Sequence, residues 1–144
     1  MPSPETNKEL AREFGERVFN RHDVEYLKDT LADDFVEHEE WSGLTPDKAG
    51  AIQWFEHLFR TVPDATAEIH QVIANGDKVA IRSTFRGTDE GGFMPGIPAT
   101  GKSFEMGAID IVRVNEEGKV AEHWGISDAM GAMIQLGLVQ PPGM

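Results

Sequence analysis

An aspartate and a histidine on neighbouring segments are the residues whose type and spacing best suit acid/base chemistry. Residues 103–114 and 119–126 alternate in polarity like strands, and a short turn separates them. If that turn closes without a bulge, Asp110 lies directly opposite His123 on one face of the pair. A carboxylate that holds an imidazole forms a coupled acid/base unit. The alternative is a polar pair that fixes the register of the strands or lies in a dimer interface.

Three further polar residues are candidates for the same site. His38 follows a short strand-like segment and is a candidate catalytic residue, or else a surface histidine in an acidic turn. Arg82 can bind an oxyanion or a carboxylate if its strand face lines a pocket, and otherwise faces solvent. Asp128 is either a second carboxylate at the pocket mouth or the N-cap of a last helix.

Large aromatic side chains supply the walls that such a pocket needs. Trp41, Trp54 and Phe55 are the candidates for contact with a substrate. Aromatic residues line many small-molecule pockets, although more often they simply fill a core. We therefore expect a small hydrophobic molecule as the ligand.

Composition excludes several other classes of function. The formal net charge of −12 and the lack of Lys/Arg clusters argue against nucleic acid. Without cysteine there is no thiolate nucleophile or Cys-ligated metal, and the five histidines lack H-x-H or H-E-x-x-H spacing. We expect no metal and no cofactor. The chain shows no signal peptide and no apolar run of about 18 residues, which predicts a cytoplasmic protein away from membranes.

The elements that position these residues change character half-way along the chain. Helical spacing over 6–20, with Thr6 as the expected cap, is followed by a short second helix and a third that begins at Thr45. From residue 66 the period is two, with a hairpin signal at 75–77 and a terminal helix after Asp128. This order predicts one α+β domain over 1–144: a cone-shaped barrel with three N-terminal helices on a curved antiparallel sheet that encloses a pocket.

One loop is longer than a simple connection requires. Residues 87–102 are rich in glycine and carry Phe93, Met94 and Ile97. Loops of this length in compact domains are usually functional or mobile. The composition fits either a lid or a dimer contact.

Several segments together resemble the SnoaL-like polyketide cyclases, within the ketosteroid-isomerase or nuclear-transport-factor-like cone fold. The most specific are the loop from Gly96 to Lys102 and the run Glu122-His123-Trp124. The similarity also covers 34–38, 87–88, 109–114, 118–125 and 128–137. The resemblance implies a cofactor-independent enzyme, with intramolecular aldol cyclisation or a related isomerisation, hydration or hydroxylation, and a homodimer or homotetramer.

The chain departs from this family at two positions. The family's aromatic-polyketide cyclases carry an acid/base Asp directly after the His-Trp pair and a His on the preceding strand. Here those positions hold Gly125 and Asp110. Either the carboxylate has moved to the neighbouring strand, or the chain is a non-catalytic small-molecule-binding protein that keeps only the cone.

Overall fold

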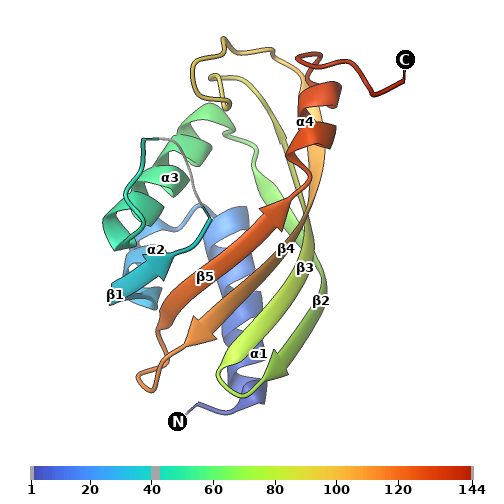
Figure 1. Cartoon of the computed structure of the whole chain (residues 1–144). Coiled ribbons are helices and arrows are strands. Elements are labelled where there is room, and N and C mark those ends of the chain that lie inside the picture. Colours follow the sequence, from blue (N-terminus) through green and yellow to red (C-terminus); the bar gives the residue numbers. More distant parts are fainter. Residues whose placement is uncertain (1, 40–42, 144) are drawn as a thin grey trace.

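The helices of the protein cover one face of a single curved sheet. A computed structural model describes residues 2–39 and 43–143 (Figure 1). Along them lie α1 (Pro4–Phe14), a π-helical segment η1 (Gly15–Asn20), α2 (Val24–Thr30), β1 (Leu31–Glu37), α3 (Lys48–Thr61), β2 (Thr66–Asn75), β3 (Lys78–Thr88), β4 (Ser103–Val114), β5 (Val120–Ser127) and α4 (Ala129–Gln135). The expected α+β class is confirmed.

The sheet differs from the expected antiparallel barrel in two respects. Its strand order is β1-β5-β4-β3-β2, and β1 pairs with β5 in parallel, so the sheet is mixed. The sheet is not closed, because β1 and β2 form its two edges. A parallel pair is possible because no hairpin joins β1 to β5: the chain enters β1 from α2 and leaves it toward α3 (Figure 1).

Two helices begin at residues other than those expected. α1 begins after Ser3, whose Oγ accepts a hydrogen bond from the Thr6 N–H at 3.1 Å. α3 begins after Asp47, whose carboxylate accepts one from the Gly50 N–H at 3.0 Å, while the Thr45 hydroxyl donates to the same carboxylate. Thr6 and Thr45 were therefore wrong as caps. Aspartate ranks above threonine at this position, which accounts for the second difference.

The long loop is held in place by one buried carboxylate. Asp89 is 1% exposed and accepts hydrogen bonds from the N–H groups of Gly92, Phe93 and Thr100 at 2.7–3.1 Å. Burial raises the pKa of Asp89, but these donors outweigh burial and lower the pKa below its usual value. Phe93 is thereby turned inward, and its ring stacks on Phe104 at 5.7 Å. The loop is therefore anchored to the domain through Asp89 and Phe93, and its role as a lid or a dimer contact stays a prediction.

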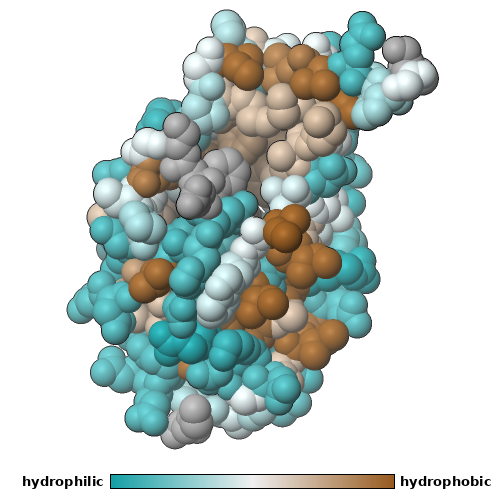
Figure 2. Space-filling model, viewed as in Figure 1, coloured by the Kyte–Doolittle hydropathy of each residue, from teal (hydrophilic) through white to brown (hydrophobic). Residues whose placement is uncertain are grey.

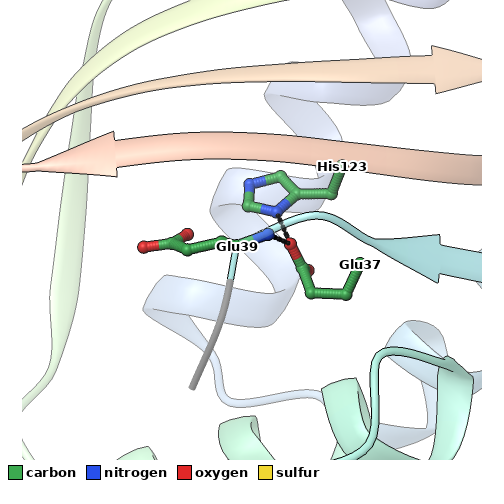
Figure 3. Close-up of side chains that lie close together, drawn as sticks. All are labelled: Glu37, Glu39 and His123. Atoms are coloured by element: carbon green, nitrogen blue, oxygen red, sulfur yellow. Dashed lines mark hydrogen bonds and ion pairs between the residues drawn. The ribbon is translucent and has the colours of Figure 1, made fainter.

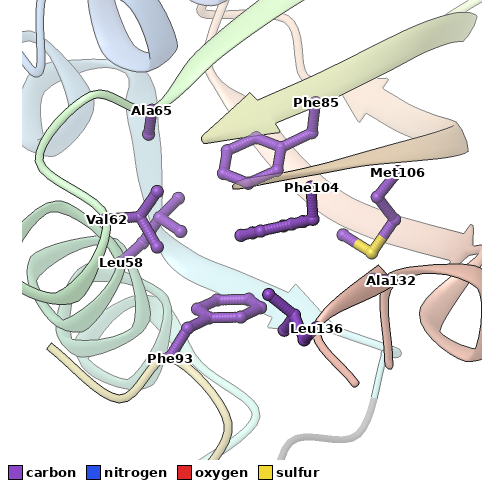
Figure 4. Packing of buried hydrophobic residues seen from close by; sticks show 9 residues of the cluster. All are labelled: Leu58, Val62, Ala65, Phe85, Phe93, Phe104, Met106, Ala132 and Leu136. Carbon is purple, nitrogen blue, oxygen red and sulfur yellow. The ribbon is translucent and has the colours of Figure 1, made fainter. Parts of the chain in front are cut away.

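Phe93 joins the largest cluster of the hydrophobic core, which lies where α3, α4 and the sheet meet (Figure 4). The cluster consists of Leu58, Val62, Ala65, Phe85, Phe93, Phe104, Met106, Ala132 and Leu136. A second cluster around Val18, Leu27 and Phe35 anchors β1 against the first helices. Within the described ranges, no helix combines the length and the apolar character needed to span a membrane.

Candidate active site

A cavity of about 200 Å³ lies between the helices and the concave face of the sheet. Most of its wall is apolar, and Trp54 and Phe55 of α3 form part of it. Their contact with a substrate stays a prediction. Trp41, the third aromatic candidate, lies outside the described residues. The charged side chains of the wall belong to β1, β4, β5 and the residues just after β1.

The β4–β5 register brings the two expected residues to this cavity by a different pairing. Asp110 pairs with Gly125, and His123 pairs with Val112. The expected direct opposition of Asp110 and His123 was wrong, because the turn pairs Val114 with Val120 and not with Lys119, and the register shifts by one further residue between Val114 and Arg113. The displacement is two residues, and side chains alternate with a period of two, so both still share one face. They meet diagonally, with His123 Nε2 2.7 Å from Asp110 Oδ1.

His123 is held on both sides of its ring by carboxylates. Its Nδ1 lies 2.6 Å from Glu37 Oε1, opposite the contact with Asp110 (Figure 3). Burial disfavours the imidazolium, but the hydrogen bonds and charges of Asp110 and Glu37 outweigh it and raise the pKa of His123 to about 10. At neutral pH the ring is therefore a cation that donates to both carboxylates.

A third carboxyl group, that of Glu39, adjoins this pair. The Glu39 backbone N–H donates to Glu37 Oε1 at 2.9 Å, which fixes the segment after β1 (Figure 3). Burial raises the pKa of Glu39, and the charges of Asp110 and Glu37 raise it further, against the opposing effect of His123. The surroundings of Glu39 thus disfavour the charged form of its carboxyl group.

Gly125 leaves room for these groups to converge. A Cβ at Gly125 would lie 2.7 Å from Asp110 Oδ1, 2.7 Å from Glu39 Oε2 and 2.8 Å from His123 Cε1. Contacts below 3.0 Å are essentially never seen for a real Cβ, so any side chain here would push the cluster apart. The space above Gly125 is therefore bordered by two carboxyl groups and an imidazolium.

Glu37, Glu39 and His123 also have the spacing of metal ligands, since one ligand atom from each lies within 4.8 Å of the others. A protonated imidazole has no lone pair for a cation, and His123 Nδ1 is already hydrogen bonded to Glu37. The observed contacts fit a proton-transfer cluster better than a metal centre. The absence of a metal and of a cofactor stays a prediction.

The profile of the SnoaL-like polyketide cyclase family matches residues 9–136. The chain belongs to this family. IdmH from Streptomyces antibioticus, described as a putative polyketide cyclase, is 31% identical with a TM-score of 0.75, over 91% of this chain and 98% of IdmH. TsrD from Streptomyces laurentii is 26% identical with a TM-score of 0.84, over 96% of this chain and all of TsrD.

A third similar structure carries a different description. AclR from Streptomyces galilaeus, a putative hydroxylase, is 25% identical with a TM-score of 0.81, over 96% of this chain and 89% of AclR. A search of curated proteins finds no match. Family membership thus supports a cyclase-type function without fixing the substrate or the reaction.

His38, expected at the site, lies on the opposite face of the sheet from the site of this SnoaL-like protein. Its ring stacks on Trp124 at 4.8 Å, and its Nε2 lies 2.7 Å from Glu122 Oε2. Glu122 also accepts a hydrogen bond from Arg113 at 2.6 Å. Glu122 and Trp124 of β5 therefore contact Arg113 of β4 and His38, just after β1, on the outer face of the sheet. Of the Glu122-His123-Trp124 run, only His123 lies in the cavity wall.

Two further candidates lie away from the cluster as well. Arg82 Nε donates to Gln71 Oε1 at 3.4 Å and lines a shallow groove on the outer face. Its strand neighbours Ile81 and Ser83 face the cavity instead, because side chains alternate along β3. Asp128 caps α4 by accepting the Gly131 N–H at 2.9 Å. The structure therefore offers no contact between the cavity and Arg82 or Asp128.

Glu37 and Glu39 are the site residues that sequence reasoning missed. A usable signal was present, because Phe35 begins an alternation that continues through Glu37 and Glu39. If Phe35 is buried, both glutamates point inward and His38 points outward. The structure has this arrangement, with Phe35 4% exposed and both glutamates in the cavity wall.

Proposed function

We propose that this protein is a cofactor-independent enzyme that removes a proton alpha to a carbonyl group and closes a ring by aldol-type addition in a small, apolar, polyketide-like substrate. The observation that carries this proposal is the approach of Asp110 Oδ1 and Glu39 Oε2 to a single point above Gly125. Membership of the SnoaL-like polyketide cyclase family supports a reaction of the cyclase type.

In this proposal Asp110 is the general base. The C–H bond alpha to the carbonyl breaks, its proton moves to Asp110, and its electron pair passes to the carbonyl as an enolate. His123 is a positioning residue for this step, because its hydrogen bond at 2.7 Å fixes the Asp110 carboxylate. Glu37 holds the other ring nitrogen of His123 at 2.6 Å and so keeps the imidazolium oriented.

Glu39 completes the proton balance as the general acid. The enolate carbon bonds to a second carbonyl carbon, and the oxygen of that carbonyl takes the proton of Glu39. The proton on Asp110 then returns to Glu39 through solvent, which restores both groups. The raised pKa of Glu39 suits it to this role, since a neutral carboxyl group must be available to donate.

Isomerisation and cofactor-free hydroxylation begin with the same enolate, and the similar structure AclR is described as a putative hydroxylase. A direct test therefore measures the shared first step. We would follow α-proton exchange of 2-tetralone, an apolar aromatic ketone, in D₂O by ¹H NMR. The parent should accelerate the exchange, and Asp110→Asn should lower the enzymatic rate by about 10²–10⁴-fold.

The matched control is Asp128→Asn, which removes a carboxylate that caps α4 outside the cavity. Its exchange rate should equal that of the parent. Binding of 2-tetralone, measured by calorimetry, should persist in Asp110→Asn. A parent that binds the ketone without accelerating exchange would support the alternative, a non-catalytic small-molecule-binding protein.

A further inference from the structure

Asn7 in α1 is a buried amide that the proposed chemistry does not use. The residue is 2% exposed, and its Oδ1 has no hydrogen-bond partner. Its side chain belongs to the wall of the same cavity. Buried polar side chains in folded proteins nearly always have a partner, so this oxygen calls for an explanation.

The surroundings of Asn7 make an amide there costly. Asn7 shares its helix face with Leu10, Ala11 and Phe14, which also line the cavity. Asparagine is a poorer helix former than leucine, and a buried carbonyl oxygen without a donor loses the hydrogen bonds it made to water. Leucine has the same branched shape, though a larger volume, and would satisfy both the helix and the apolar wall. The amide is the exception on this face.

Asn7 and the acid/base cluster lie toward opposite ends of the cavity. Ala11, one turn after Asn7, packs with Val114 at the end of β4. Asp110 lies farther back along β4, about 13 Å from Val114 at about 3.3 Å per residue. Figure 1 shows the start of α1 at the end of the molecule that holds the β2–β3 and β4–β5 turns. A ligand must therefore be longer than a single ring to approach both ends.

We propose that Asn7 determines specificity, because its Oδ1 accepts a hydrogen bond from a hydroxyl group at the end of the ligand remote from the reacting carbonyl. The substrate class is then an apolar ring compound with a phenolic or enolic hydroxyl. This inference rests on the proposed function only in taking the cavity as the ligand site. Hydroxyl recognition does not require turnover, so the two proposals fail separately.

The test compares two probes of nearly equal size, 2-naphthol and 2-methylnaphthalene, whose Kd values are measured by calorimetry. In the parent, the hydroxyl should be preferred over the methyl group. In Asn7→Leu this ratio of Kd values should fall by roughly tenfold, the usual effect of losing one buried hydrogen bond. In Asp110→Asn the ratio should stay within about twofold of the parent, although α-proton exchange is lost.

A ratio that is unchanged by Asn7→Leu would overturn the inference, since a trapped water would then be the partner of the amide. A ratio that falls in Asp110→Asn and not in Asn7→Leu would overturn it too, because the hydroxyl would bind the acid cluster. If Asn7→Leu does not fold, ¹⁵N NMR of the parent decides. The side-chain amide signals of Asn7 should shift with 2-naphthol and not with 2-methylnaphthalene, and equal shifts would contradict the proposal.

Discussion

Replacement of Asp110 by Asn should lower the pKa of His123 and weaken the fold in a pH-dependent way. In the parent, the two flanking carboxylates raise this pKa from 6.5 to about 10. An opposite charge within about 6 Å typically accounts for about 1–3 pKa units. Loss of Asp110 should therefore lower the His123 pKa by about 1–3 units and leave Glu37 as the remaining partner.

The same shift gives the sign of the stability effect. A histidine whose pKa is raised on folding stabilises the fold fully below its unfolded pKa, near 6.5, and loses this contribution as the pH rises toward its folded pKa. One unit corresponds to about 1.4 kcal/mol, so Asp110→Asn should reduce the free energy of unfolding by about 1–4 kcal/mol at pH 6. The His123 side chain is 19% exposed, which favours the lower half of that range. The deficit should stay constant up to the folded pKa of His123 in the variant, about 1–3 units below that of the parent, and then shrink until about pH 10.

The assay is an NMR titration of the histidine ring protons from pH 5 to 11, with urea unfolding of parent and variant at about pH 6 and about pH 10.5. His123→Gln assigns the resonance, and Asp128→Asn is the control that removes a carboxylate away from the ring. A His123 that titrates near 6.5 in the parent would refute the reasoning. So would an Asp110→Asn protein in which the pKa and the pH profile of stability match those of the parent.

Three further changes test the site, the loop and the outer face. Gly125→Ala places a Cβ 2.7 Å from two carboxyl oxygens and should slow α-proton exchange by about 10²-fold. The control is Gly107→Ala, whose added Cβ would have no atom within 4 Å and should leave the exchange rate unchanged. Phe93→Ala should lower the free energy of unfolding, measured in urea, by about 3–5 kcal/mol, because the Phe93 residue is only 4% exposed. The control is Ile126→Ala, at a residue that is 81% exposed, which should change this free energy by less than about 0.5 kcal/mol. We also propose a homodimer or homotetramer formed through the outer face of β4 and β5, where Ile109, Ile111 and Ile126 are exposed. Figure 2 shows exposed hydrophobic residues on the molecular surface. Ile126→Lys should then yield monomers in light scattering, and an unchanged mass would exclude that face.

Much of the fold is visible in the sequence because it is set by local pattern. The hairpin at Asn75-Gly76-Asp77 and the strand over 103–114 occur as expected, since turn chemistry and period-two alternation are local properties. The shared face of Asp110 and His123 was also predictable. Their direct pairing was not, because neither the longer turn, which pairs Val114 with Val120, nor the irregularity between Arg113 and Val114 has a signal in the local pattern.

The rest of the site escaped prediction because it depends on a distant strand. Glu37 and His123 are 86 residues apart in the chain, and no local pattern indicates that β1 adds in parallel beside β5. Without that pairing, His38 is the obvious histidine of the segment and Glu39 is one acid among several. The alternation that starts at Phe35 places the glutamates correctly only once the burial of Phe35 is known.

The position of β1 at the sheet edge has a consequence for how the protein folds. The hairpins of β2–β3 and β4–β5 need only short chain segments to form, whereas β1 must close a loop of more than half the chain to reach His123. We therefore expect His123 to acquire Glu37 and Glu39 last, after most of the sheet exists. Enzymatic activity should return more slowly than strand structure during refolding, and the pKa of His123 would serve as a built-in reporter of that final step.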